Sequence, residues 1–239
     1  MNTATAASSG AETITKFELL NAQDHRHLRL GFRRDSRQHF VQIVVGEFLA
    51  AAASCPVLLT KDATTGDFYA GALLGFKPGE CMLKNAAERG GFEPLNFQRE
   101  GFFTAGENIA IDRSNARFGQ QGDLLFDETQ QPSARLRQIQ RVLRRLHDGI
   151  QKTNQFIDTL LSLKLVESID ISMNFDDGER LTLKGLYTVS MDSLQALGDA
   201  QIVALFRRGD LQCIHAMHAS LNQIAVLADK RNRELNASL

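Results

Sequence analysis

Residues 167–175 read ESIDISMNF and residues 180–189 read RLTLKGLYTV, and together they contain the clearest structural signal in the chain. Both segments alternate polar and apolar residues with a period of two, which is typical of half-buried strands. Between them, Asp176, Asp177 and Gly178 are residue types that favour a tight turn. We therefore predict a β-hairpin over this stretch.

The residues before the hairpin predict a long amphipathic helix. From Pro132 onward apolar residues recur at steps of three and four, which places them on one face of a helix. Pro132 itself suits a helix start. The residues of the predicted apolar stripe are Leu136, Ile139, Leu143, Leu146, Ile150, Ile157 and Leu160.

The residues after the hairpin predict shorter helices. We expect a short helix over residues 192–197 closed by Gly198, and a second helix that is capped by Asp199 and runs to Gly209. Asp210 is expected to cap one final helix over residues 211–235, whose apolar stripe serves either a monomer core or a homodimer.

The first half of the chain is richer in strand signals. Strands are predicted over residues 39–45, 56–60, 68–76 and 107–112, a short helix over 47–54, and a loop over 85–99. Because strands and helices are partly segregated, we predict a single-domain α+β fold. It combines a mixed or antiparallel sheet with a helical layer that includes a long central helix and a C-terminal helix. Residues 1–13 are expected to form a disordered tail, and residues 14–239 one globular domain.

Composition restricts the class of protein. The chain has 239 residues and a formal net charge of −1, whereas a dedicated nucleic-acid binder needs a basic surplus. We find no apolar run long enough to span a bilayer and no signal peptide, and the three cysteines match no disulfide scaffold. We expect a cytoplasmic protein with reduced thiols, and signal-independent export stays open. Motifs of nucleotide enzymes, serine hydrolases and zinc proteases are absent from the sequence, and no cofactor is predicted.

Several residue groups are candidates for a site, and each has a structural alternative. His215 and His218 lie three residues apart on a predicted helix, so they can share a metal, or His218 can be a hydrogen-bonded core residue. Glu47 lies in an apolar segment where a raised pKa would suit proton transfer, or it can stabilise the first turn of the following helix. Asp24, His25 and His27 form a further possible metal group or a solvated segment.

Two segments are candidates for anion or partner contact. Arg137, Arg141, Arg144 and Arg145 gather opposite the apolar stripe of the long helix, as a phosphate or acidic-partner surface or simply as its solvated face. The glycine-rich segment 71–80 brings Lys77 to a turn, where it can meet an anion or end a strand.

Five segments, in order, resemble the bacterial SapC family. They are Glu47-Phe48 with the alanines after it and then residues 55–59 (CPVLL), residues 72–80 (ALLGFKPGE), residues 124–128 (LLFDE), Asp177-Gly178 with residues 183–187 (LKGLY), and residues 220–222 (SLN). The resemblance covers roughly residues 16–230. Cys55 stands where the family usually has an aromatic residue, and Cys81-Met82 also departs from its pattern.

The resemblance implies a family rather than a reaction. The family is named after a protein linked to a bacterial surface layer, and is distinct from the transporter permease of the same name. Its members are often encoded beside tryptophan-halogenase-like proteins and TonB-dependent receptors. No catalytic residue set is implied.

From these observations we predict a soluble, non-catalytic accessory or binding protein that acts with a partner protein in a surface-layer or TonB-dependent uptake context. Aromatic and arginine side chains dominate interface energetics, so the expected contacts lie on the basic helix face and in the Phe-rich segment 92–103. One alternative is an enzyme with metal- or flavin-linked oxidative chemistry that uses Glu47 with His215 or His218. Another is a structural surface-layer component. The expected contact residues are Arg137, Arg141, Arg144, Phe92 and Phe102.

Overall fold

The predicted hairpin is present in the computed structural model, which describes residues 17–31, 38–83 and 91–237. Strands β10 (Val166–Asn174) and β11 (Arg180–Val189) pair in antiparallel register, and Gly178 in their turn has a φ of 82°. Glycine adopts this left-handed conformation without the steric penalty of a side chain. The predicted tail over residues 1–13 lies outside the described residues, so its boundary stays a prediction.

The hairpin is one edge of a five-stranded antiparallel sheet in the order β10-β11-β4-β5-β3. Strands β4 (Val57–Lys61) and β5 (Phe68–Leu73) form a second hairpin, and β3 (Phe40–Gln42) closes the other edge. β3 and β5 are both shorter than predicted. β5 ends early because the backbone turns at Leu74 and Gly75, whose N–H groups both donate to the carbonyl oxygen of His39.

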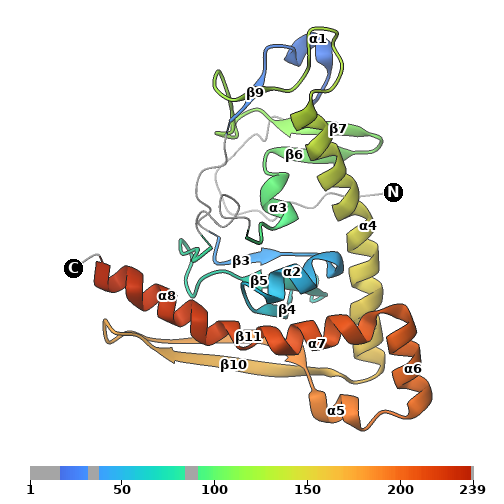
Figure 1. Ribbon diagram of the computed structural model, residues 1–239, viewed down its shortest axis with the longest axis vertical. Helices are drawn as coiled ribbons and strands as arrows, with labels where there is room; N and C mark the ends of the chain where they lie inside the picture. The colour runs from blue at the N-terminus through green and yellow to red at the C-terminus, as the bar shows by residue number, and fades with distance from the viewer. Residues whose placement is uncertain (1–16, 32–37, 84–90, 238–239) are drawn as a thin grey trace.

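Two smaller sheets lie above the five-stranded sheet in Figure 1, and all strand pairs in the described residues are antiparallel. The first has the order β1-β7-β6 and the second has the order β8-β2-β9. Their strands are β1 (Phe17–Leu19), β2 (Arg29–Leu30), β6 (Phe102–Ala105), β7 (Asn108–Asp112), β8 (Phe118–Gly119) and β9 (Asp123–Leu124), and the short helix α1 (Ala22–His25) lies beside them.

The long helix α4 (Ala134–Ser162) runs past both the upper sheets and the five-stranded sheet (Figure 1). Its 29 residues correspond to a length of about 43 Å. The helix begins after Pro132, because Ser133 is the N-cap and its hydroxyl accepts a hydrogen bond from the N–H of Leu136. Its first half packs into an upper core cluster with Phe102, and its last turns pack into the main core cluster with Phe48.

The prediction that Ile150 belongs to the buried apolar stripe of α4 is wrong. Ile150 is 45% exposed, and Gly149 and Thr153 are buried at this level of the helix instead. Here the 3₁₀ helix η1 (Val45–Glu47) and the residue before it, Val44, lie against α4. The backbone N–H of Val45 donates to Thr153 Oγ1 at 2.8 Å, which turns this face of the helix toward η1.

The C-terminal helices differ from the prediction at their starts. Gly198 and Gly209 occupy the N-cap positions of α6 (Asp199–Arg208) and α7 (Asp210–Ser220), so Asp199 and Asp210 are first helical residues rather than caps. An acidic side chain in the first turn still interacts favourably with the helix dipole. The short helix α5 (Met191–Gln195) precedes them, as predicted.

The predicted final helix over residues 211–235 is two helices, α7 and α8 (Gln223–Ala237). The two segments pack into different core clusters: Ile214 and Met217 of α7 into the main cluster, and Leu227 and Ala228 of α8 into a cluster with residues of the β10–β11 hairpin. The break after Ser220 allows each helix to follow its own apolar contacts.

Two short helices complete the described chain. The predicted helix over 47–54 is present as η1 followed by α2 (Phe48–Ala52). The segment 85–99, predicted as a loop, contains helix α3 (Leu95–Gln98), which follows Pro94. The α+β fold class is confirmed. No helix in the described residues is long and apolar enough to cross a membrane.

Gly185 produces a bulge that bends the β10–β11 hairpin. Across the register shift one β10 residue, Asp170, faces two β11 residues, Lys184 and Gly185, and Gly185 has a φ of 74°. β11 pairs with β4 only beyond this bulge, at Leu186 and Tyr187. The distal part of the hairpin therefore leaves the sheet and runs beside α8 (Figure 1).

We expect Gly185→Ala to lower the free energy of unfolding by about 1–2 kcal/mol, because an alanine is strained at this φ. Urea denaturation followed by circular dichroism measures the change. Gly119→Ala is the matched control, since Gly119 lies in strand β8 with no atom within 4 Å of an added Cβ and no positive φ. Equal stability of the two variants would contradict the role of the bulge.

Candidate binding site

Three adjoining hollows lie between α4 and the edge of the five-stranded sheet, and we refer to them together as the α4 trough. α4 lines the first and second hollows, whereas the third is lined by residues of β3, β5 and α3 and has no lining residue from α4 within the described ranges. The first has a volume of about 510 Å³, the second about 270 Å³ and the third about 840 Å³. The first and second share Thr104, Leu143 and His147. The second and third share Gln42, Asn96, Arg99 and Phe103. Neighbouring hollows therefore adjoin at these shared lining residues.

The walls of the trough come from elements that are distant in sequence. α4 contributes Leu143 and His147 to one wall, and α3 and β6 contribute Asn96 and Thr104 to the other. The edge strand β3 contributes Gln42, whose carbonyl oxygen accepts a hydrogen bond from Asn96 Nδ2 at 2.8 Å. This bond fixes α3 relative to the sheet, so the trough is a property of the fold rather than of a single loop.

Arg99 is the cation at the centre of the trough. Its Nε donates to Asn96 Oδ1 at 2.7 Å and its Nη1 donates to the carbonyl oxygen of Phe102 at 3.2 Å. The guanidinium carbon lies 5.3 Å from the ring centroid of Phe103, within the range of a cation–π contact. Burial lowers the pKa of Arg99 from its usual value, and no described acidic side chain forms an ion pair with it.

The predicted basic face of α4 is exposed, but only part of it reaches the trough. Arg137, Arg141, Arg144 and Arg145 are all solvent-exposed, and none forms an ion pair with an acidic side chain in the described part of the chain. Arg137 Nη1 donates to the carbonyl oxygen of Pro132 at 2.6 Å. Of these four residues, Arg144 lines the first hollow.

Phe102, one of the expected contact residues, does not reach the surface of the structure. Phe102 is fully buried in the upper core cluster, with its ring 5.1 Å from that of Phe118. Adjacent residues of a strand point to opposite faces of the sheet, so Phe103 lines the trough while Phe102 fills the core. Phe92 is half-buried and packs against the main core cluster. The alternation along β6 was the signal that distinguishes Phe103 from Phe102.

Glu47 is a buried structural carboxylate. Its Oε2 accepts the N–H of Val44 at 2.9 Å and its Oε1 accepts the N–H of Leu95 at 2.8 Å, so both oxygens are used by backbone groups. Burial raises the pKa of Glu47, although the two backbone hydrogen bonds and the charge of Arg145 act to lower it. The side chain joins η1 to α3 and therefore positions one wall of the trough.

We expect Glu47→Gln to lower the free energy of unfolding by about 1–3 kcal/mol, since the amide nitrogen would face a backbone N–H that has lost its acceptor. Guanidinium denaturation at pH 7 measures this change. The exposed residue Glu107 provides a control, and Glu107→Gln should leave the midpoint unchanged. An unaltered midpoint for Glu47→Gln would contradict the role of Glu47 in joining η1 to α3.

The predicted metal candidates lie at two separate places in the fold. His215 and His218 are both exposed on α7, so His218 is not a core residue. His25 is buried and contacts Asn21 and Glu18, whereas His27 is exposed and pairs with Arg26. No group of three or more metal-ligating His, Cys, Asp or Glu side chains occurs in the residues that the structure describes.

None of the three cysteines, all of which lie within the described ranges, forms a disulfide, and all three belong to the main core cluster or pack against it. Cys55 and Cys81 are buried and Cys213 is half-buried. Burial raises the pKa of Cys55 to about 12 and that of Cys213 to about 11. Because the thiolate is the reactive form of cysteine, these thiols are chemically quiet at neutral pH.

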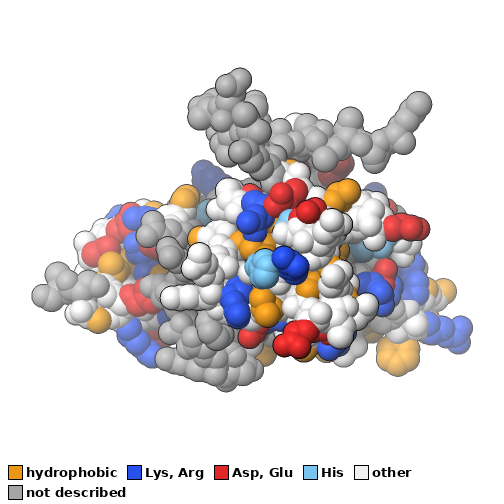
Figure 2. Space-filling view, turned by 90° about the horizontal axis from the view of Figure 1, so that it is seen from above, with side chains coloured by type: hydrophobic (Ala, Val, Ile, Leu, Met, Phe, Trp, Pro, Cys, Tyr) orange, Lys and Arg blue, Asp and Glu red, His pale blue; other side chains and the backbone are white. Residues whose placement is uncertain are grey.

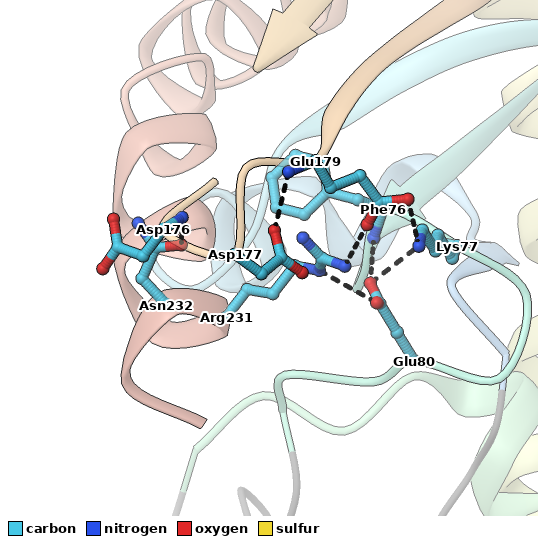
Figure 3. A network of polar contacts seen from close by, with 8 residues as sticks. All are labelled: Phe76, Lys77, Glu80, Asp176, Asp177, Glu179, Arg231 and Asn232. Carbon is cyan, nitrogen blue, oxygen red and sulfur yellow. Dashed lines mark hydrogen bonds and ion pairs between the residues drawn. The ribbon is translucent and has the colours of Figure 1, made fainter. Parts of the chain in front are cut away.

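A charged network that the sequence analysis did not anticipate joins three distant segments (Figure 3). Arg231 of α8 is 4% exposed; its Nε donates to Glu80 at 2.9 Å and its Nη2 donates to Glu179 at 2.8 Å. Lys77, the residue predicted to meet an anion or end a strand, forms an ion pair with Glu179. The guanidinium of Arg231 also lies 4.0 Å from the ring centroid of Phe175.

Glu80 completes this network by holding its own turn. Its Oε2 accepts the N–H groups of Phe76 and Lys77, at 3.1 and 3.2 Å. The network thus fastens the turn after β5, the tip of the β10–β11 hairpin and α8 to one another. The hydrophobic periodicity of the sequence does not indicate that Arg231 is buried in a network, because a single arginine on an amphipathic helix is usually solvent-exposed.

The network predicts a loss of stability at acid pH. The hydrogen bonds from Lys77 and then Arg231 hold the pKa of Glu179 below its usual value. The stability that ionised Glu179 provides is therefore complete above the pKa of an unfolded glutamate, about 4.3. It is lost as the pH falls through the lower pKa that Glu179 has in the folded protein. We expect Glu179→Gln to be less stable than the original chain at pH 7, with the difference shrinking below about pH 4.

Urea denaturation midpoints of both proteins between pH 7 and pH 3 test this expectation. Glu167→Gln serves as the control, because Glu167 is exposed on β10 and forms no ion pair within the described ranges. A difference between Glu179→Gln and the original chain that stays constant with pH would contradict the proposed role of the carboxylate.

The end of the molecule that carries α1 and β9 shows mixed surface chemistry. Figure 2 looks onto this end, and its coloured acidic, basic and hydrophobic side chains are interspersed rather than gathered by type. Among the residues coloured on this face, side chains of one charge do not gather into a patch, in contrast to the arginines on α4.

Comparison with known proteins identifies a family but no individual relative. The family model described as SapC matches residues 20–227, which is most of the chain. No curated protein and no solved structure gave a significant match.

Proposed function

The chain belongs to the SapC family, and on this premise we propose that it is a non-catalytic binding protein that receives an acidic segment of a partner protein in the α4 trough. The surface-layer or TonB-dependent uptake context, and the cytoplasmic location expected by default, belong to this proposal and rest on the sequence and its family resemblance.

The observation that carries the proposal is that Arg144, one of the expected contact residues, and Phe103 line adjoining hollows. The expected aromatic contacts Phe92 and Phe102 line none of the three hollows. Arg144 comes from the basic face of α4, and Phe103 comes from the Phe-rich segment 92–103. They line adjoining hollows of one trough although they are far apart in sequence. A depression that combines arginine with a half-buried aromatic ring has the residue types that dominate binding energy at interfaces.

The charges at the centre of the trough favour an acidic side chain there, because the second hollow is lined by Arg99 and by no described acidic residue. Arg144 and His147 lie on the α4 side of the trough, and Arg99 lies at its centre. Arg141 is exposed beside them on the same helix. Arginine binds carboxylates through a planar array of donors, and such pairs strengthen when they are partly removed from water. Glu107 in the first hollow and Asp62, Asp67 and Glu100 in the third limit the positive region to the centre of the trough.

The role of Glu47 also favours binding over proton transfer. Both of its oxygens accept backbone N–H groups, so its geometry is that of a clamp rather than of a general base facing a substrate. The side chain instead determines how α3 stands against η1, and hence the shape of the depression.

Charge reversal on α4 tests the proposal. We expect the double variant Arg141→Glu and Arg144→Glu to bind a fluorescein-labelled peptide of alternating Glu and Leu about tenfold more weakly than the original chain, measured by fluorescence anisotropy. Arg207→Glu is the matched control, because Arg207 is an exposed arginine on α6, away from the trough. Circular dichroism establishes that all variants are folded.

Two results would refute the proposal. One is equal affinity of the double variant and the Arg207→Glu control for the Glu–Leu peptide. The other is equal binding by the original chain of a matched peptide of alternating Lys and Leu, which would show that charge complementarity plays no part.

A further inference from the structure

The second hollow of the trough has a distinct chemical composition. Its titratable side chains in the described residues are Arg99 and His147, and it has no acidic side chain among its lining residues. Two amides, Gln42 and Asn96, add polar atoms. The remaining lining is mostly apolar: Val44, Phe103, Leu143, Leu146 and Ile150, with Thr104 beside them.

Hydrogen bonds fix the orientation of the Arg99 guanidinium in this hollow. Its Nε and Nη1 are fixed by Asn96 and by the carbonyl oxygen of Phe102, and Nη2 has no protein partner within residues 17–31, 38–83 and 91–237. The side chain is half-buried, yet no described carboxylate neutralises its charge. A guanidinium that is oriented, partly desolvated and without an acidic partner is suited to donate hydrogen bonds to a carboxylate from another molecule.

The apolar residues that line the hollow with Arg99 indicate what accompanies that carboxylate. Ile150 is 45% exposed on α4 although neighbouring members of the helix stripe, such as Leu146, are buried. Ile150 lines the second hollow, whose volume of about 270 Å³ equals roughly nine waters at about 30 Å³ each. The hollow thus has room for a side chain that carries a carboxylate, with apolar surface beside it.

The openings of the hollow argue for a polypeptide rather than a free acid. It shares Thr104 and Leu143 with the first hollow, and Asn96 and Phe103 with the third. The second hollow therefore adjoins a further hollow on each side, and an extended chain that lies across all three would place one side chain in the middle hollow.

We propose that the second hollow takes an acidic side chain of the partner segment, with its carboxylate on Arg99 and a neighbouring apolar side chain against Leu146 and Ile150. This inference rests on the proposed function and deepens it. It adds an anchor that lies outside the basic face of α4 and specifies the partner motif as an acidic residue next to an apolar one.

Ile150→Glu tests the anchor, because it places a carboxylate of the chain itself in the hollow at a position that is already partly exposed. We expect it to weaken binding of the Glu–Leu peptide about tenfold. Leu161→Glu is the matched control: Leu161 is 42% exposed on the same helix but lies outside the trough, and its variant should bind as the original chain does.

Arg99→Met provides a second measurement that removes the charge while keeping an apolar stem. It should lose the preference for the Glu–Leu peptide over a matched Gln–Leu peptide, and Arg99→Lys should restore part of that preference. Thermal unfolding shows whether each variant is folded, and Ile150→Glu keeps the proposal testable if the Arg99 variants are not.

The outcomes separate this inference from the proposed function. If the Arg141 and Arg144 reversals weaken peptide binding but Ile150→Glu and Arg99→Met do not, the trough binds its partner without this anchor and the inference is wrong. If no variant weakens binding, the proposed function fails as well. If hexanoate binds the original chain and not Ile150→Glu, while the peptide binds neither, the hollow is a site for free acids and the peptide assignment is overturned.

Discussion

The contact between Gly149 and Val44 sets the spacing on which the rest of the structure depends. A Cβ at position 149 would lie 2.6 Å from Val44 Cγ2, so only glycine allows α4 to come this close to the chain before η1. At the same level Thr153 accepts the N–H of Val45, and Glu47 ties Val44 to Leu95. Helix, 3₁₀ turn and α3 are thereby locked together, which fixes the two walls of the α4 trough.

The segments on which the family resemblance rests prove to be junctions of the fold. Ser220 is fully buried, and its hydroxyl accepts the N–H of Val57, which joins the segments 220–222 and 55–59. Glu80 and Glu179, in or beside two other such segments, share Arg231. In these segments the family pattern therefore coincides with points where distant parts of the chain meet.

Sequence patterns predicted the elements that depend on local periodicity. The β10–β11 hairpin and the long helix follow from periods of two and 3.6, and both are present. Features that depend on tertiary packing were not predictable in this way. Ile150 is exposed because η1 takes its place at the helix surface, and Phe102 differs from Phe103 only in which face of β6 it occupies. Arg99 and Arg231 gain their roles from neighbours far away in sequence.

The hydrogen bond between Ser220 and Val57 also has a consequence for synthesis of the chain. It links residues 163 positions apart, and the bond between Arg231 and Glu80 spans 151 positions. While the chain is still on the ribosome, the central strand β4 lacks α7, whose Ile214 and Met217 fill the main core cluster. The apolar surface of the sheet therefore stays uncovered until nearly the whole protein has emerged from the ribosome. During this period the nascent chain most needs protection from aggregation.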